Sequence, residues 1–332
     1  MDTLNRQTPE CPISGDEGRV KHVHCRDSFF NTPGVWTYMI NPRTDHVWLY
    51  EFPNNQEQIA AFYDNYYTHS EVNKSNALKQ IDELASFALG YNKYPRNSLT
   101  GTVLKCIPSL FEAAKLEWMD IHSGKFQTVL DFGCGSGTLL KKYQIAGKSV
   151  TGFEPDPKAA NLARKSGLEI FTSLDDLLEK NAYFDIIILS HVIEHLLDPE
   201  QEIKRLLPLL SENGRIIITT PNANSLGHKI FGKFWRGLEP PRHFNIFTFQ
   251  SMNDLAKRLR LEINIKSSSR LARGIFFQSM LARMGYKNTE MSRPRNQTLK
   301  YIGYLFQIFE HLILKVVKEA GEEIYVEFEC KK

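Results

Sequence analysis

The sequence has few cysteines and almost no net charge. It contains five cysteines, an odd number, scattered through 332 residues. This usage is unlike the disulfide framework of a small secreted domain, so we expect a reducing, cytoplasmic location. The 41 Lys and Arg residues nearly balance the 38 Asp and Glu residues, for a net charge of +3. A dedicated nucleic-acid-binding protein normally shows a stronger basic bias, so no nucleic-acid partner is expected.

Long apolar runs are also missing. The most apolar stretch, residues 301–317, is interrupted by Gln307, Glu310, His311 and Lys315. It falls short of the roughly 20 apolar residues that span a bilayer, so no transmembrane segment is expected. No apolar signal peptide opens the chain, and the sequence contains no repeat or low-complexity tract.

The second half of the chain alternates short apolar runs with helical patterns. Runs rich in Val, Ile and Phe predict strands at 127–133, 148–155, 168–173, 184–190, 214–222, 261–268 and 322–330. Helical spacing lies between them, at 138–147, 157–167, 199–214 and 251–260. The alternation predicts an α/β fold with a doubly wound, mostly parallel, Rossmann-like sheet. Because a long excursion precedes the last strand, we expect that strand to lie beside the fifth.

Some helix ends can be predicted from single residues. The first three helical patterns all end at a glycine, which suits the end of a helix, and the third would therefore run to Gly214. Ser251 and Asp254 have the spacing of a capping box at the start of the fourth.

A glycine-rich turn follows the first of these strands. Gly133, Gly135 and Gly137 stand between that strand and the next helix, where glycines permit a tight turn and close approach of a ligand to the backbone. Glu154 ends the second strand, about 20 residues further on, where an acidic side chain can bind both ribose hydroxyls of a nucleotide-like ligand. Together these features predict a nucleotide-type cofactor site.

Two details separate this turn from a dinucleotide fingerprint. Thr138 stands where a third spaced glycine would be expected, and Asp131 precedes the first glycine by two positions. The pattern resembles motif I of the class I S-adenosylmethionine (SAM)-dependent methyltransferases. Residues 154–156 resemble their second motif, 184–199 the fourth-strand motif of the ubiquinone-type branch, and 214–222 their fifth strand.

The resemblance covers roughly residues 126–265 and the last strand. It implies an antiparallel last strand and SAM as cofactor. Asp131 would reach the methionine amino group, Glu154 the ribose hydroxyls, and Ser173 with Leu174 would flank the adenine. The implied cofactor-binding residues are Asp131, Gly133, Gly135, Gly137, Glu154, Pro155, Ser173, Leu174 and Ser190.

The N-terminal segment resembles a zinc ribbon that has lost ligands. Some bacterial methyltransferases of glycan and natural-product pathways carry such a ribbon before a tyrosine-rich stretch. Here Cys11 is kept, whereas Ser14, Asn41 and Thr44 stand at the other ligand positions. Structural zinc needs four soft or imidazole ligands, so we expect no metal, with His22, His24 and Cys25 as the only nearby substitutes.

Residues 190–200, "SHVIEHLLDPE", place three candidate catalytic residues at the exit of the fourth strand, at the start of an expected helix. These are His191, Glu194 and His195, and the later His243 is a fourth candidate. In related enzymes an E-x-x-E-H motif binds a divalent ion. His191 replaces its first carboxylate, which disfavours Mg²⁺ and leaves a softer ion as an alternative. We predict His191 as the general base or an acceptor contact, while a structural role for Glu194 and His195 stays open.

Acceptor contacts are expected from two further regions. Tyr63 and Tyr67, in the tyrosine-rich linker, either pack against the core or line the acceptor pocket. The loop after the fifth strand holds Trp235, Arg236 and Arg242, whose charged groups suit a phosphate or carboxylate.

Four parts of the chain are expected: 1–75, a zinc-ribbon-like segment with its linker; 76–270, the SAM-binding core; 271–320, a helical insertion; and 321–332, the last strand. The insertion would form an acceptor lid, a dimer interface or a contact with a membrane surface. Lys287, Arg293, Arg295 and Lys300 favour the membrane alternative. A monomer and a homodimer both remain open.

The sequence thus predicts a SAM-dependent methyltransferase. O-methylation of a small-molecule acceptor, such as a sugar, a nucleotide-sugar or a natural-product intermediate, is expected. The alternatives are N- or C-methylation of a similar acceptor, an NAD(P)-dependent oxidoreductase, and a cofactor-binding protein without catalysis.

Overall fold

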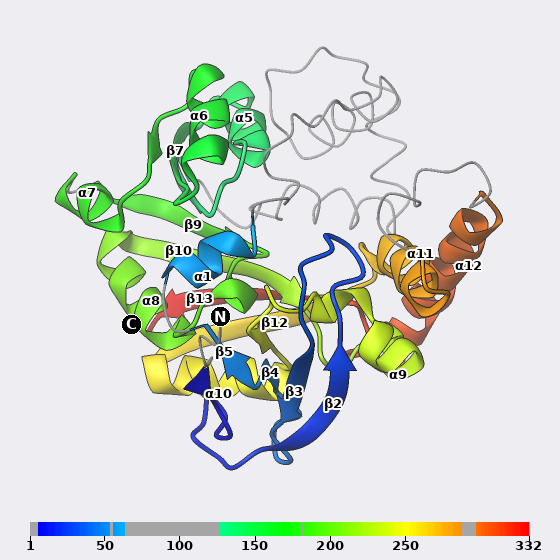
Figure 1. The fold of residues 1–332 in the computed structure, drawn as a ribbon. Coiled ribbons are helices and arrows are strands. Elements are labelled where there is room, and N and C mark those ends of the chain that lie inside the picture. The colour runs from blue at the N-terminus through cyan, green and yellow to red at the C-terminus, as the bar shows by residue number, and fades with distance from the viewer. Residues whose placement is uncertain (1–5, 54–55, 64–125, 181, 287–296, 332) are drawn as a thin grey trace. The chain divides into compact units, whose positions relative to one another are not determined.

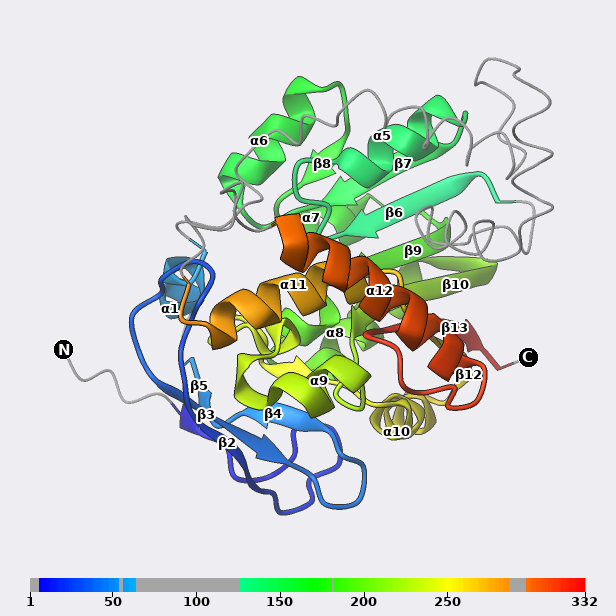
Figure 2. The same cartoon turned by 90° about the vertical axis from the view of Figure 1, so that its right-hand side faces the viewer.

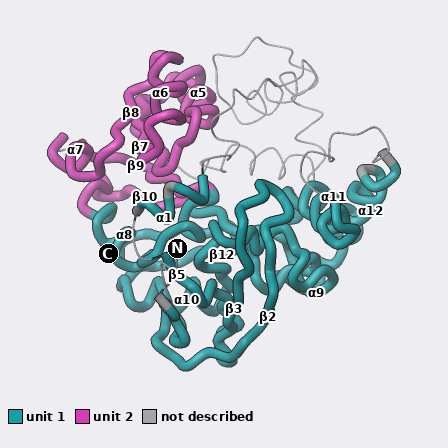
Figure 3. Tube along the Cα trace, viewed as in Figure 1, with its two compact units in different colours: residues 1–66, 191–207, 218–332 teal, residues 67–190, 208–217 magenta. Residues whose placement is uncertain are grey.

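The computed structural model describes residues 6–53, 56–63, 126–180, 182–286 and 297–331 (Figure 1). The chain forms two compact units (Figure 3). Unit 1 contains residues 1–66, 191–207 and 218–332, and unit 2 contains residues 67–190 and 208–217. The four-part division expected from the sequence stays a prediction.

A seven-stranded sheet has the strand order β12-β13-β10-β9-β6-β7-β8. Its strands are β6 (Thr128–Phe132), β7 (Ser149–Phe153), β8 (Ile170–Phe171), β9 (Phe184–Ser190), β10 (Leu210–Pro221), β12 (Leu261–Ser268) and β13 (Glu323–Cys330). β6 pairs in parallel with β7 and β9, and β7 with β8, whereas β12 and β13 are antiparallel. The predicted α/β sheet is therefore confirmed, and the last strand does lie beside the fifth, β10.

Apolar side chains in the strands account for the core of unit 2. Val129 and Leu130 in β6 are fully buried, as are Ile187 and Ile188 in β9, which suits strands covered on both faces. A cluster of buried residues lies next to the glycine turn and connects it to the helices at 138–145 and 157–165: Cys134, Leu140, Ala160, Ala163, Leu168 and Ile170.

The described residues of unit 2 include three helices: α5 (Thr138–Ile145), α6 (Pro157–Lys165) and α7 (Leu174–Glu179). Asp156 caps α6 by accepting a hydrogen bond from Lys158 N at 2.8 Å. Gly147 and Gly167 follow α5 and α6 with positive φ, as the glycine signals in the sequence predict.

Unit 1 holds α8 (Pro199–Leu206), α9 (Leu226–Phe231), α10 (Phe249–Leu259), α11 (Ala272–Arg283) and α12 (Gln297–Leu314). The expected helix to Gly214 is wrong: α8 ends at Leu206 and β10 begins at Leu210. Pro208 lies in the intervening 3-10 turn, where it lacks the N–H that would continue the helix. No helix among the described residues is long and apolar enough to cross a bilayer.

The start of α10 also differs from expectation. The capping box is formed by Thr248 and Ser251, because Thr248 Oγ1 accepts from Ser251 N and Ser251 Oγ accepts from Thr248 N. The predicted pair of Ser251 and Asp254 is wrong, since the helix begins two residues earlier, at Phe249.

The N-terminal segment folds as an antiparallel sheet of β2 (Arg19–Cys25), β3 (Trp36–Ile40) and β4 (Val47–Leu49), completed by β11 (Asn245–Ile246) in the order β11-β4-β3-β2 (Figure 1). Two shorter strands, β1 (Arg6–Gln7) and β5 (Glu51–Phe52), pair beside it, and α1 (Gln56–Ala61) follows. Trp48 and Tyr38 are completely buried, and Tyr38 Oη donates to Leu238 O at 2.6 Å, so this segment packs against the later residues of unit 1.

Hydrogen bonds join two positions that the zinc-ribbon resemblance assigns to ligands. Asn41 Nδ2 donates to Ser14 Oγ at 2.8 Å and to Asp16 Oδ2 at 2.9 Å. Asn41 Oδ1 accepts from the backbone N–H groups of Arg43 and Thr44, at 2.8 and 3.2 Å. Asn41 is fully buried, so this amide links the two turns of the N-terminal segment.

Candidate active site

The glycine turn lies in unit 2 between β6 and α5. Gly133, Gly135 and Gly137 all have positive φ, at 80°, 54° and 77°, which side-chain-bearing residues rarely adopt. A Cβ atom on Gly137 would meet Leu168 Cδ1 at 2.3 Å. Glycine is therefore required here both by conformation and by the close packing of the turn against the loop after α6.

Glu154, the residue directly after β7, is hydrogen-bonded to this turn. Its Oε2 accepts from Gly135 N at 2.8 Å, and its Oε1 accepts from Asp156 N at 3.0 Å. The carboxylate is 8% exposed and lies in the position where the resemblance implies a ribose contact. Glu154 therefore shapes the glycine turn as well as offering acceptor oxygens to a ligand.

Asp131 is a buried acid in β6, two residues before the first glycine of the turn. It is 3% exposed, and no donor among the described residues reaches its carboxylate. Burial, together with the neighbouring charge of Glu154, raises its pKa to about 7. A buried acid without a donor suits a ligand that brings a positive group, such as the amino group of SAM. The residues of the turn therefore fit this cofactor.

The remaining cofactor candidates also belong to unit 2. Ser173 caps α7 by accepting from Asp176 N, and Leu174 is the first residue of that helix. Pro155 is exposed between Glu154 and the cap of α6. Ser190 is the last residue of β9. Their contact with a cofactor stays a prediction.

His191, in unit 1, follows Ser190 directly and has a positive φ of 54°. The expected helix does not begin here: Ile193–His195 form one 3-10 turn, and α8 begins only at Pro199, capped by Asp198. His191 N donates to Thr219 O at 2.9 Å, which fixes the backbone beside β10. A left-handed conformation at a residue other than glycine needs such support from its surroundings.

The His191 ring lies between two buried carboxylates. Its Nδ1 is 3.2 Å from Glu194 Oε1 and its Nε2 is 3.0 Å from Glu323 Oε1. Carboxylates only accept hydrogen bonds, so both ring nitrogens must carry a proton. Burial alone would lower the pKa of His191, but the two carboxylates raise it to about 9. His191 is thus a cation at neutral pH, and a protonated imidazole cannot act as the general base predicted from the sequence.

Glu323 is a site residue that the sequence reasoning missed. Arg270 also bonds to it, through Nε at 3.0 Å and through Nη2. Although burial raises the pKa of Glu323, Arg270 and His191 lower it to about 2. The only sequence signal was a pair of acids, Glu322 and Glu323, at the start of a buried strand.

His195 and His243 lie close to Glu194, and their ring centroids are 4.7 Å apart. His243 Nδ1 is 2.7 Å from Gly237 O, and His195 Nδ1 is 3.0 Å from Arg242 O and 2.8 Å from Tyr63 Oη. Burial lowers the pKa of both rings, that of His243 to about 4, so both are neutral at pH 7. The structure therefore brings all four predicted catalytic residues into unit 1, with one charged imidazole and two neutral ones.

Glu194, His195 and His243 also offer three ligand atoms within 4.8 Å of one another. The Nδ1 atoms of both imidazoles bond to backbone carbonyls. Together with the carboxylate, the two rings form a donor set that suits a soft divalent ion. However, Glu194 Oε1 already binds the His191 cation and its Oε2 accepts from Thr220 Oγ1 at 3.0 Å. These partners compete with an ion for the carboxylate, which disfavours a metal.

Arg242 and Trp235 are buried structural residues in this fold. Arg242 is fully buried and bonds to Glu239 and Asp27, each at 2.9 Å, while its guanidinium lies 4.4 Å from the ring centre of Phe30. Trp235 donates from Nε1 to Glu322 Oε2 at 2.7 Å. Protein groups already bind the polar atoms of both side chains, which supports a structural role over the acceptor contacts expected from the sequence.

The other two acceptor candidates differ in their setting. Arg236 is partly exposed, bonds to Gln278 at 2.8 Å and to Glu239, and lies over the Phe29 ring. Tyr63 contacts His195, whereas Tyr67 lies outside the described residues. Tyr63 and Arg236 therefore remain candidates.

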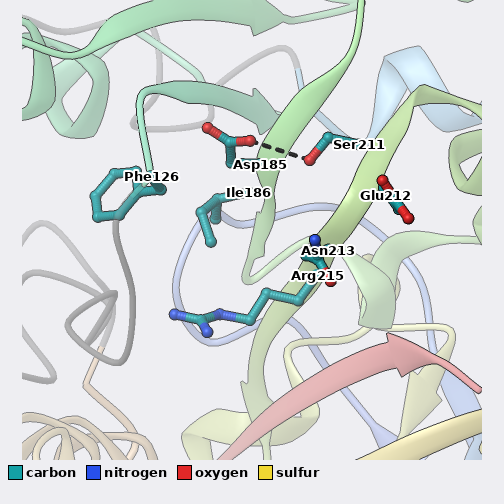
Figure 4. A pocket seen from close by; sticks show the side chains of 7 residues that line it. All are labelled: Phe126, Asp185, Ile186, Ser211, Glu212, Asn213 and Arg215. Atoms are coloured by element: carbon teal, nitrogen blue, oxygen red, sulfur yellow. Dashed lines mark hydrogen bonds between the residues drawn. The ribbon is translucent and has the colours of Figure 1, made fainter. Parts of the chain in front are cut away.

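The described part of each unit also contains a cavity that is lined by other residues. In unit 2, Phe126, Asp185, Ser211 and Arg215 line a cavity of about 290 Å³, where Asp185 Oδ1 accepts from Ser211 Oγ at 3.0 Å (Figure 4). In unit 1, a cavity of about 390 Å³ is lined by Lys21, His22, Asp45, His228 and Lys229, among others. His22 Nε2 lies 2.9 Å from His228 Nε2 there, and burial lowers both pKa values, to about 4 and 3.

Comparison with known proteins decides the family. Residues 76–264 match the methyltransferase domain family, which is more than half of the chain. The chain belongs to this methyltransferase domain family. The prediction of a SAM-dependent methyltransferase domain, with SAM as its cofactor, is confirmed.

Two of the curated relatives are ubiquinone biosynthesis O-methyltransferases. The one from Aromatoleum aromaticum is 31% identical over 33% of this chain and 51% of its own length. The one from Xylella fastidiosa is 27% identical over 47% of this chain and 64% of its own length. The chain thus spans about half of the length of the first of these relatives.

One solved structure that matches is the plantazolicin methyltransferase BpumL in complex with S-adenosylhomocysteine (SAH). It is 14% identical, with a TM-score of 0.41 over 77% of this chain and 98% of that chain.

Proposed function

We propose that the protein transfers the methyl group of SAM to an oxygen atom of a small-molecule acceptor. The names of the curated relatives, ubiquinone biosynthesis O-methyltransferases, support an oxygen acceptor. Sugars, nucleotide-sugars and natural-product intermediates are the acceptor classes to test first.

The residues proposed to hold the donor are those of the glycine turn and its neighbours. Asp131 would bind the amino group, Glu154 the ribose hydroxyls, and the backbone of Gly133 to Gly137 would approach the ligand closely. When bound, SAM supplies a methyl group on a positively charged sulfur, which is reactive without further activation. The chain's own residues must therefore position the acceptor and take its proton.

His195 is the proposed proton acceptor, because its Nδ1 lies 3.0 Å from Arg242 O and its Nε2 is left to act as the base. The ring is partly exposed and neutral at pH 7. With a proton on Nδ1 donated to Arg242 O, the Nε2 lone pair is the basic position. The hydroxyl oxygen would lose its proton to Nε2 as it gains the methyl group.

His191 takes a different role from the one expected. Because both of its nitrogens donate to carboxylates, it acts as a fixed cation that orients Glu194. His191 directly follows Ser190, a predicted cofactor contact at the end of β9, which supports a role for His191 in the active site. We infer that it is a positioning residue.

The test uses SAM with a labelled methyl group and a panel of phenol, sugar and nucleotide-sugar acceptors, with SAH release and product mass as readouts. Replacing His195 with Gln should lower turnover by roughly 10²- to 10⁴-fold while SAM binding is kept. His24→Gln, which changes an exposed histidine on β2, is the matched control. Unchanged turnover of the His195 variant would reject the assignment.

A further inference from the structure

Helix α12 presents an apolar face to the outside of unit 1. Seven apolar residues of this helix are exposed, and Tyr301, Leu305 and Ile308 are 68%, 66% and 59% exposed. The others are Ile302, Tyr304, Phe309 and Leu312. A soluble helix normally places charged or polar residues on its outer side. Contiguous exposed apolar side chains on one element mark an interaction surface.

The inner side of α12 is already packed against α11, which runs beside it in unit 1 (Figure 2). The ring centres of Phe276 and Phe306 are 4.7 Å apart, and a Cβ atom on Gly303 would lie 2.9 Å from Arg273 O. Glu310 is also buried on this side. The outer apolar face is therefore not needed to attach the helix.

The width of the face indicates what kind of partner it suits. At about 100° per residue, the positions from Tyr304 to Ile302 around the helix cover an arc of about 160°. The seam that one helix presents to another is narrower than this. A broad arc that includes two tyrosines, Tyr301 and Tyr304, suits a flat apolar phase with a polar boundary, which is what a bilayer interface offers.

Charge along the sequence points the same way. Residues 287–318 contain six cations, Lys287, Arg293, Arg295, Lys300, Lys315 and Lys318, and two acids, Glu290 and Glu310. Burial raises the pKa of Glu310 to about 9, so this acid adds no negative charge at pH 7. The segment that contains α12 is thus basic, and anionic headgroups complement it.

The same charges argue against a second copy of the chain. A two-fold dimer through α12 would bring together two segments of the same net positive charge. An anionic lipid surface has no such conflict. We propose that the outer face of α12 docks on the surface of an anionic membrane, with its apolar side chains inserted at the headgroup boundary. This proposal does not rest on the proposed function.

The experiment measures binding of the full chain to vesicles of phosphatidylcholine with and without phosphatidylglycerol. Wild type should bind the anionic vesicles, and binding should weaken with added salt. The double change Leu305→Asp and Leu312→Asp should lower the partition coefficient at least about tenfold. Val20→Asp removes an apolar side chain that is 58% exposed on β2, and should leave binding unchanged. Titration with SAH and far-UV circular dichroism check that each variant is folded.

Leu305→Trp gives a second readout that does not remove the apolar surface. Its fluorescence should shift to shorter wavelength with anionic vesicles, whereas Val20→Trp should not respond. Absence of vesicle binding by wild type would overturn the proposal. So would a wild-type dimer in light scattering that the double change converts to a monomer, because the face would then be covered by a second copy. Protection of the tryptophan at position 305 without vesicles or self-association would show that the chain itself covers it, with the same consequence.

Discussion

His191 Nε2 lies 3.0 Å from Glu323 Oε1, which links the residue after β9 to the first residue of β13. Glu194 bonds to the other ring nitrogen, so the imidazole is held as a cation by two carboxylates. His191 in "SHVIEH" is therefore a fixed positive charge and not a base. The neutral neighbour His195 is the proposed proton acceptor instead.

Removing one carboxylate should lower the pKa of His191. A raised histidine pKa adds stability that is complete below the unfolded value of about 6.5 and is lost as pH rises through about 9. Glu323→Gln should therefore shift the ring titration, followed by NMR of the imidazole Cε1–H, toward lower pH. A titration that is unchanged in Glu323→Gln would contradict the pairing.

His191→Ala should lose most turnover while SAM binding stays near normal, because Glu194 then loses the cation that orients it.

Metal removal should leave methyl transfer unchanged, because the His191 cation already occupies one oxygen of Glu194. Prolonged treatment with EDTA, followed by an activity assay, checks this. His191→Glu should create two carboxylates beside His195 and His243 and allow Mn²⁺ binding, measured by calorimetry. Loss of wild-type activity in EDTA that Mn²⁺ restores would reverse the interpretation.

SAM affinity should fall as pH drops below about 7. Asp131 must be ionised to bind the amino group, and its pKa in the free protein is about 7. Affinity should then decrease about tenfold for each pH unit below that value. Calorimetric titration with SAH, repeated at steps of about half a pH unit between about pH 5.5 and about pH 8, measures the slope of affinity against pH. Asp131→Asn should bind more weakly and without this slope. An equally steep slope in the variant would mean that another group titrates.

Glu310→Gln should stabilise the protein at alkaline pH. Glu310 is buried on α12, and burial with the nearby Glu322 raises its pKa to about 9. The folded state thus binds more protons than the unfolded state above about pH 4.5, and stability is lost as pH rises through about 9. Urea unfolding at pH 6 and pH 9 should show a smaller difference for the Glu310→Gln variant than for wild type. Exposed Glu212 provides a control, since Glu212→Gln should leave the difference unaltered.

Loss of the Asn41 amide should destabilise the N-terminal sheet. Asn41 bonds to Ser14 and to backbone N–H groups of its own turn, and Asn41→Ala leaves these groups unpaired. We expect a decrease of about 1–3 kcal/mol in the free energy of unfolding. Asn213→Ala, at an exposed site, should change it by less than about 0.5 kcal/mol. Equal effects of the two changes would contradict the role of Asn41.

The sheet and the glycine turn could be predicted because their signals are local. Apolar runs mark strands such as β6 and β9, and Glu154 stands in register with the turn that it bonds to. The partner of His191 could not be predicted, because Glu323 lies 132 residues away and only the fold brings them together. The burial of Arg242 could not be predicted for a similar reason, because its partner Asp27 is 215 residues away.

The most direct test of the central claim uses SAM with a ¹³C-labelled methyl group. After turnover with the acceptor found in the panel, the ¹³C chemical shift of the product shows which atom carries the methyl group. We expect a methoxyl signal, formed more slowly by His195→Gln and at an unchanged rate by His24→Gln. A methyl group on nitrogen or carbon, or equal rates for His195→Gln and wild type, would contradict the account.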